Sequence, residues 1–142
     1  MIQISNTIEV NRPVTQVFEY IADVNNNPLW MPVQGVQKIS QGAAAESFQF
    51  KQQFLLMGAQ YDLNGVFTKF EPDKKISFVF DSPVFTWRGD YLFEPTPNGT
   101  RLATVGNVIL TGPMKMMETM FAPKIRKLVN DAAPNLKKIL ES

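Results

Sequence analysis

Apolar and polar residues alternate at the start of the chain, and this period changes twice further along. Residues 2–10 alternate with the period of a strand that has one buried face, and Asn6 is the single polar residue on that face. Pro13 then precedes apolar residues at positions 14, 17, 18 and 21, which predicts a short amphipathic helix. Residues 25–32, NNNPLWMP, predict one more helical turn or a tight loop, because their two prolines leave room for nothing longer.

Residues 33–111 predict six strands in an antiparallel meander. Turn signals occur at residues 42–47, 58–59, 72–75, 82–83 and 97–99. Between these turns the large apolar side chains share one parity within each strand: Phe48, Phe50, Phe54, Leu56; Tyr61, Leu63, Phe67; Ile76, Phe78, Phe80; Phe85, Trp87, Tyr91, Phe93; and Leu102, Val108, Leu110. Every long strand therefore has one apolar face, and a single sheet covers a single core.

Residues 113–142 return to the helical period and predict a long C-terminal helix. The residues expected on its buried stripe are Met114, Met117, Phe121, Ile125, Leu128, Ala132, Leu136 and Ile139 or Leu140. Pro123 and Pro134 each remove a hydrogen bond within the helix, so we expect the helix to be kinked or broken at both.

This order of elements is similar to a known architecture. The segments IEVNRPVTQVFEYIADVNNNPLWMP, WRGDYLFEPTPNGTRL and NLKKILES resemble the helix-grip proteins of the SRPBCC superfamily, which include polyketide cyclase/dehydrase-like and START-like proteins. The resemblance covers essentially the whole chain. It implies an α+β fold in which a seven-stranded antiparallel sheet wraps around a long C-terminal helix, with two short helices after the first strand. It also implies a cavity for an apolar ligand between sheet and helix.

Length, composition and charge narrow the possible functions. The chain has 142 residues and a mass of 16.1 kDa, which predicts one domain over residues 1–142. It contains neither cysteine nor histidine, so disulfides, thiolate metal sites and a histidine base are excluded, and we expect no metal or other cofactor. A net charge of +1 gives no general affinity for nucleic acid. Because the N-terminus does not resemble a signal peptide and no apolar run could span a bilayer, we expect a cytoplasmic protein without integral membrane association.

Several aromatic and methionine side chains are candidates for the wall of a ligand cavity. Met114, Met116, Met117 and Met120 give the start of the last helix an adaptable apolar surface, which would serve either a pocket or an ordinary helix core. The residues that we expect to bind a ligand are Trp30, Met31, Gln52, Phe54, Tyr61, Phe78, Phe80, Trp87, Tyr91, Met117 and Phe121. No catalytic residue is predicted.

Some polar residues occupy strand positions that the alternating pattern assigns to the apolar face. These residues are Asn6, Gln52, Tyr91 and Thr104. Each of them either orients a ligand or makes a structural hydrogen bond. The carboxylates of Asp62, Asp90 and Glu94 lie on the opposite parity, so we expect them in solvent and find no carboxylate pair for acid–base chemistry. The basic residues of the last helix, Lys124, Arg126, Lys127, Lys137 and Lys138, fit a solvated helix face or weak contact with an anionic partner.

The leading functional hypothesis is the binding or transport of a small hydrophobic molecule that is lipid-, polyketide- or sterol-like. One alternative is a cofactor-free cyclase or dehydratase that acts on a polyketide-like substrate. Another is a protein-interaction module, as in co-chaperone-like members of the superfamily. The sequence does not distinguish oligomeric states.

Overall fold

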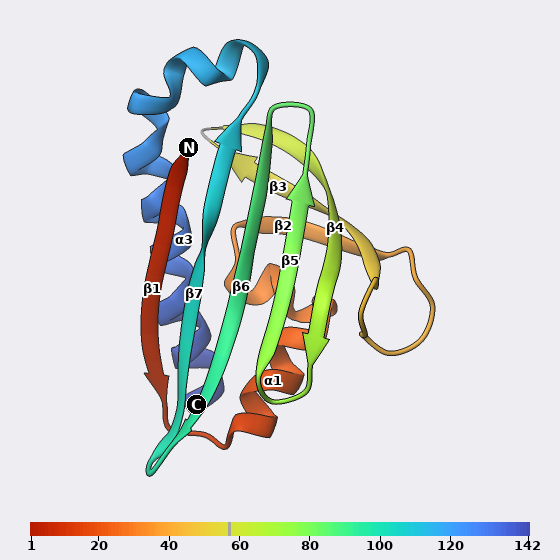
Figure 1. The fold of residues 1–142 in the computed structure, drawn as a ribbon, viewed down its shortest axis with the longest axis vertical. Helices are drawn as coiled ribbons and strands as arrows, with labels where there is room; N and C mark the ends of the chain where they lie inside the picture. Colours follow the sequence, from red (N-terminus) through yellow and green to blue (C-terminus); the bar gives the residue numbers. More distant parts are fainter. Residues whose placement is uncertain (57) are drawn as a thin grey trace.

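The chain forms one seven-stranded antiparallel sheet with a long helix packed against it, as a computed structural model that describes residues 1–56 and 58–142 shows (Figure 1). The strands are β1 (Ile2–Val10), β2 (Val33–Lys38), β3 (Gln49–Leu56), β4 (Ala59–Glu71), β5 (Lys75–Asp81), β6 (Phe85–Thr96) and β7 (Gly99–Leu110). The helices are α1 (Val14–Ala22), the 3₁₀ helix η1 (Val24–Asn26), α2 (Asn27–Trp30), the 3₁₀ helix η2 (Gly112–Met117) and α3 (Glu118–Glu141). The predicted helix-grip fold is confirmed.

The sheet has the strand order β1-β7-β6-β5-β4-β3-β2, so the first strand lies beside the last one and the two edges are β1 and β2. Every neighbouring pair is antiparallel. The predicted parity also holds, since alternate side chains are buried along each long strand and join one hydrophobic cluster. The core therefore lies on one face of the sheet, where the helices cover it.

Helix α1 closes part of the core with one apolar face. Pro13 precedes the helix, and Val17, Phe18 and Ile21 are buried as their spacing predicts. The Phe18 ring packs edge-on against Phe70 and Phe93, with centroid distances of 5.1 and 5.0 Å. These edge-to-face contacts attach α1 to the sheet.

Helix α3 continues through both of its prolines, so of the two predicted outcomes, a kink or a break, the break is wrong. Its buried stripe contains Phe121, Ile125, Ala132, Leu136 and Leu140, as predicted. The predicted helical segment does differ at its start, because residues 112–117 form the 3₁₀ helix η2, which has about three residues per turn and does not continue the stripe of α3.

The methionines near the start of α3 are mostly exposed. Met116, Met117 and Met120 expose 92%, 40% and 57% of their surface, while Met114 is half-buried against the core. Neither the pocket nor the helix-core interpretation describes the three exposed methionines, because Met116 and Met117 lie in the 3₁₀ helix and Met120 lies off the buried stripe of α3.

A row of polar contacts joins α3 to the edge strand β1, and we call it the β1–α3 seam. Its contacts are Met1 ammonium to Glu118, Arg126 Nε to Gln3 O at 3.1 Å, Asn6 Nδ2 to Asn130 Oδ1 at 3.1 Å, Lys137 Nζ to Glu9 O at 2.6 Å, and Asn11 N to Glu141 Oε2 at 2.8 Å. Residue numbers rise together in strand and helix, so the two elements run in the same direction. Arg126 and Lys137 thereby supply donors to main-chain carbonyls of an edge strand.

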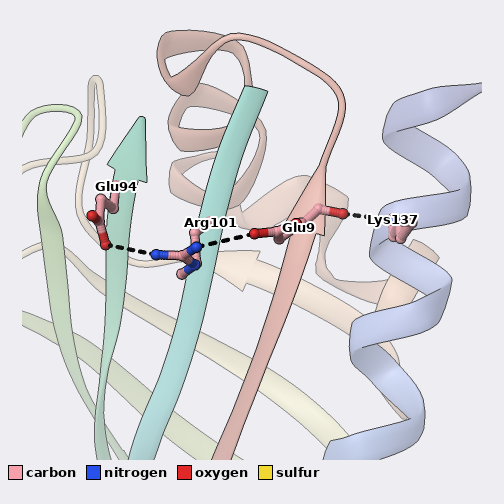
Figure 2. Close-up of polar contacts among 4 residues, drawn as sticks. All are labelled: Glu9, Glu94, Arg101 and Lys137. Carbon is pink, nitrogen blue, oxygen red and sulfur yellow. Dashed lines mark hydrogen bonds and ion pairs between the residues drawn. The ribbon is translucent and has the colours of Figure 1, made fainter. Parts of the chain in front are cut away.

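The seam connects to an ion-pair row across the sheet (Figure 2). Arg101 lies opposite Glu9 and Glu94 in the two strand pairs, and its guanidinium contacts their carboxylates at 3.1 and 3.5 Å. Lys137 then reaches the main chain of Glu9 from α3. Each of these partly exposed contacts contributes about 1 kcal/mol or less, so the row orients the end of α3 more than it stabilises the fold.

Candidate functional site

A narrow cavity lies between the sheet and α3. Its sheet wall contains Asn6, Gln52, Phe54, Leu63, Trp87, Tyr91, Leu102 and Thr104. Trp30, Met31, Pro32 and Val33 form the wall where α2 leads into β2, and Val129, Ala132, Ala133 and Leu136 form the wall from α3. The space open to the centre of a water molecule is about 30 Å³, which is enough for about two waters.

Small side chains on α3 leave this space open. Ala132 and Ala133 are both buried and face large aromatic side chains from the other walls. A second apolar hollow, lined by Phe54, Leu56, Phe85, Trp87, Val108, Ile125 and Val129, lies beside the first. Phe54, Trp87 and Val129 line both hollows, so they form the partition between them.

Three of the polar lining residues form a row across neighbouring strands. Asn6 of β1 pairs with Thr104 of β7, and Thr104 pairs with Tyr91 of β6. Side chains at directly opposed positions lie on the same face of a sheet, so this register gathers an amide, a hydroxyl and a phenol at one level of the cavity wall. The sequence singled out all three residues from their parity, and the structure brings them together.

Gln52 is the fourth polar residue that parity singled out, and it has a structural partner. Its Oε1 accepts a hydrogen bond from Asn27 Nδ2 at 3.1 Å, and the two residues expose only 2% and 3% of their surface. This contact links β3 to the first turn of α2. Of the two roles considered for Gln52, the structural hydrogen bond is thus present, although the residue also lines the cavity.

Among the described residues that line the cavity, Tyr91 is the one with an ionisable side chain. Burial raises the pKa of its phenol far above its usual value near 10. The phenol therefore remains protonated throughout the physiological range and acts as a neutral hydrogen-bond donor. Trp30 lies close to it, with a ring-centroid distance of 6.2 Å.

The predicted ligand-binding residues fall into three groups in the structure. Those that line the cavity are Trp30, Met31, Gln52, Phe54, Trp87 and Tyr91. Phe78 and Phe80 lie behind the wall: the Phe78 ring is 4.8 Å from Tyr91 and 5.2 Å from Trp87, and the Phe80 ring is 5.5 Å from Trp87. Tyr61, Met117 and Phe121 lie outside the lining, because Tyr61 packs against Phe85, Met117 is exposed, and Phe121 belongs to the core beneath α3.

Several residues that line or support the cavity were not predicted from the sequence. Asn27 begins the four-residue helix α2, which is too short for a periodic pattern, so nothing in the sequence marked its buried amide. Ala133 and Val129 flank the predicted stripe of α3 and contact the cavity because the stripe is wider than one residue per turn. Ala132 and Leu136 were predicted as buried, and only the three-dimensional arrangement places them at the cavity.

The carboxylates that were expected in solvent lie away from the cavity. Asp62 and Glu94 are exposed, and Asp90 is half-buried on the opposite face, where its Oδ1 accepts a hydrogen bond from Ser77 Oγ. The lining therefore has no carboxylate or cation among the residues that the structure describes. Within residues 1–56 and 58–142, no helix is long and apolar enough to cross a membrane.

A curved antiparallel sheet, a long terminal helix and a cavity between them define the helix-grip class of proteins. The family model for polyketide cyclase/dehydrase and lipid transport proteins matches residues 1–141, and the chain belongs to this family. No curated protein sequence matches the chain.

Solved structures share the fold at low sequence identity. A protein of Thermus thermophilus matches with a TM-score of 0.81 and 14% identity over 96% of this chain and 94% of that one. A START superfamily protein from Mycobacterium smegmatis matches with a TM-score of 0.75 and 18% identity over 99% and 95% of the two chains. The Zhui aromatase/cyclase from Streptomyces sp. R1128 matches with a TM-score of 0.77 and 12% identity over 97% and 90%. At these identities the likeness describes the fold.

Proposed function

We propose that the protein binds a small, largely apolar molecule in the cavity between the sheet and α3. The observation that carries this proposal is the cavity itself, which is lined by apolar and aromatic side chains with a few polar groups gathered at one level. Such a lining is typical of small-molecule sites, where apolar burial supplies affinity and a few polar groups fix orientation. The chain belongs to a family whose description includes lipid transport, and this supports the same function.

Ligand entry requires the walls to separate, because the water-accessible space of about 30 Å³ is smaller than any bicyclic molecule. Met31 and Pro32 are half-buried and connect α2 to β2, so they lie at the outer boundary of the cavity. Trp87 is also half-buried and separates the two hollows. A shift of these side chains joins the hollows into one larger site.

The test is a titration of the full chain with 1-aminoanthracene, an uncharged fluorescent probe. Both tryptophans of the chain line the cavity, so binding there should transfer energy from tryptophan to the probe with saturable one-to-one stoichiometry. Ala133→Leu fills part of the cavity with a larger side chain and should abolish this signal. Ala122→Leu is the matched control, because Ala122 is a half-buried residue of the same helix outside the lining.

Two results decide the test. Loss of the signal in Ala133→Leu alone, with both variants folded by circular dichroism, supports the proposal. Non-saturable emission, or equal binding by the wild type and Ala133→Leu, contradicts it. Native mass spectrometry of the freshly purified protein adds an independent measurement, since a co-purified apolar compound would have a defined mass.

A second candidate is a cofactor-free cyclase or dehydratase, and the buried phenol of Tyr91 favours it. A protonated phenol in a water-poor site stabilises negative charge that develops on a carbonyl oxygen. Incubation with a linear poly-β-ketone substrate mimic tests this candidate, with cyclised product measured against the spontaneous rate. Tyr91→Phe should reduce product formation towards the spontaneous rate, while equal rates with and without wild-type protein would reject the enzyme.

A further inference from the structure

Unpartnered polar atoms gather around the cavity. Five buried side-chain nitrogen or oxygen atoms lack a hydrogen-bond partner among the described residues, and four of them belong to residues that line the cavity. These four are Asn6 Oδ1, Trp30 Nε1, Trp87 Nε1 and Tyr91 OH, and the fifth is Tyr20 OH in α1. Buried polar atoms are nearly always paired in folded proteins, so such a concentration at one place calls for a functional explanation.

These atoms belong to residues on the inner face of the sheet and on α2 that line the same cavity. Asn6 and Tyr91 are joined through Thr104 in the cross-strand row, and Trp87 shares the inner face of β6 with Tyr91. Gly89 lies between them on that face, and the Phe78 ring of the neighbouring strand packs over it in contact with both Trp87 and Tyr91. Trp30 approaches Tyr91 from α2.

The chemical types of these groups define what would satisfy them. The two indole N–H groups and the phenol O–H are donors, and Asn6 Oδ1 is an acceptor. The amide nitrogen of Asn6 already has a hydrogen-bond partner, because Nδ2 donates to Asn130 Oδ1 in the β1–α3 seam. The amide is therefore held in place, and its oxygen is free to accept from a ligand.

The lining also excludes charged ligands. It contains no lysine, arginine, aspartate or glutamate within the described part of the chain. A carboxylate or an ammonium group that entered this cavity would lose its hydration without gaining a counter-charge, which is strongly unfavourable. An apolar body with neutral polar groups meets no such penalty.

We infer that the cavity selects an uncharged, mainly apolar molecule that carries two or more carbonyl-type oxygens, and that it binds such a molecule more tightly than a fatty-acid carboxylate or a plain hydrocarbon. This inference rests on the proposed function, since it names the chemistry of the ligand for the same site. Carbonyl oxygens accept from Trp30, Trp87 and Tyr91, and a ligand hydroxyl donates to Asn6 Oδ1. Binding then supplies partners for groups that have no protein partner among the described residues.

A series of bicyclic probes tests the inference: naphthalene, 1-tetralone, 1,4-naphthoquinone and 1-naphthoate. The probes share a similar apolar frame and differ in carbonyl count and charge. Each carbonyl that accepts a hydrogen bond should lower Kd by about five-fold, as expected for one net hydrogen bond. Naphthoquinone should bind most tightly and naphthoate most weakly, as measured by calorimetry, and no cysteine is present to react with the quinone.

Nuclear magnetic resonance of the ¹⁵N-labelled wild type provides a readout that needs no variant to fold. The chain has two tryptophans, so its spectrum contains two indole N–H signals. Naphthoquinone should move both indole proton signals downfield through hydrogen bonding, and naphthalene should not. Trp30→Phe and Trp87→Phe should each weaken naphthoquinone binding by about five-fold and change naphthalene binding by less than about two-fold.

Tyr61→Phe is the matched control for Tyr91→Phe. Tyr61 lies outside the cavity lining, so its loss of a hydroxyl should not affect selectivity, whereas Tyr91→Phe should reduce the preference for naphthoquinone. Equal binding of naphthalene and naphthoquinone, or tightest binding of naphthoate, overturns the inference and leaves the proposed function standing. If none of these probes and no 1-aminoanthracene binds, the proposed function itself fails.

Discussion

Gln52 places a buried amide in the middle of an apolar run on β3. Its oxygen accepts from Asn27 Nδ2, so Gln52→Leu leaves a buried donor without a partner. We expect the free energy of unfolding to fall by about 1–3 kcal/mol, as measured by chemical denaturation. Gln53→Leu is the matched control: Gln53 is exposed on the opposite face, and its replacement should change stability by about 0.5 kcal/mol or less. Unchanged or increased stability of Gln52→Leu would show that the contact with Asn27 does not support the fold.

The buried phenol of Tyr91 should make the folded protein less stable at alkaline pH. Its folded-state pKa lies above the value near 10 that it has when unfolded, so above that pH the unfolded chain has lost a proton that the folded chain retains. Stability is thus independent of this group below about pH 10 and declines above it, by at most about 1.4 kcal/mol per pH unit. Denaturation at pH 9, 10 and 11 should show a shallower decline for Tyr91→Phe than for the wild type. Parallel declines would place the Tyr91 phenol in contact with solvent.

Parity within strands was sufficient to find four polar residues of the candidate site. Asn6, Gln52, Tyr91 and Thr104 all break an apolar pattern of period two, and the regular backbone of a strand turns that pattern into a position on one face. Asn27 has no such pattern around it, because it lies where η1 leads into α2. Which polar group has a partner depends on contacts between distant segments, and a single strand does not encode these.

At the scale of elements, β6 and β7 approach each other closely at a pair of glycines. Gly89 and Gly106 lie opposite each other, and a Cβ on Gly106 would come within 2.3 Å of Arg88 O and 2.7 Å of Gly89 Cα. Backbone atoms cannot move aside without separating the strands. We therefore expect Gly106→Ala to lower the free energy of unfolding by about 2 kcal/mol or more, as is typical of strained core changes.

Gly35→Ala in β2 is the control for that substitution. A Cβ at Gly35 would meet its nearest neighbour, the Gln53 side chain, at 3.6 Å, which is ordinary contact. Its unfolding midpoint in denaturant should remain close to that of the wild type. Similar losses in both variants would indicate a general cost of removing glycine from this sheet, independent of the close approach.

The element boundaries show where sequence patterns are informative and where they are not. Strand positions and the buried stripe of α3 followed from periodicity, because each element is regular over many residues. The start of the last helix was predicted wrongly, since 3.0 and 3.6 residues per turn differ little over a segment as short as η2. The exposed positions of Met116 and Met117 follow from that short 3₁₀ segment.

At the scale of the whole molecule, the fold followed from the sequence but the size of the cavity did not. The order of elements and one apolar face per strand suffice for a helix packed on a sheet. The cavity volume depends on how closely Trp30, Trp87 and Tyr91 approach Ala132 and Ala133, which come from separate elements. Small differences in the distances between these side chains decide whether the space holds two waters or a ligand.

The β1–α3 seam also influences how molecules of this protein behave toward one another in concentrated solution. A sheet edge with free carbonyl and amide groups is a template for another strand, and this sheet has two edges. The β2 edge is six residues long, has an irregular register between Val33 and Gly35, and ends at Lys38, all of which disfavour strand addition. On β1, Arg126 and Lys137 donate to main-chain carbonyls that an added strand would need.

Removing these two side chains should therefore promote self-association more than unfolding. We expect Arg126→Ala/Lys137→Ala to lose only about 1 kcal/mol of stability, because both contacts are exposed, yet to form aggregates whose light scattering rises with protein concentration. Lys127→Ala/Lys138→Ala removes the same charge from α3 without uncovering the edge and should remain monodisperse. The polar contacts that attach the last helix to the first strand would thus also keep the protein from polymerising through its own sheet.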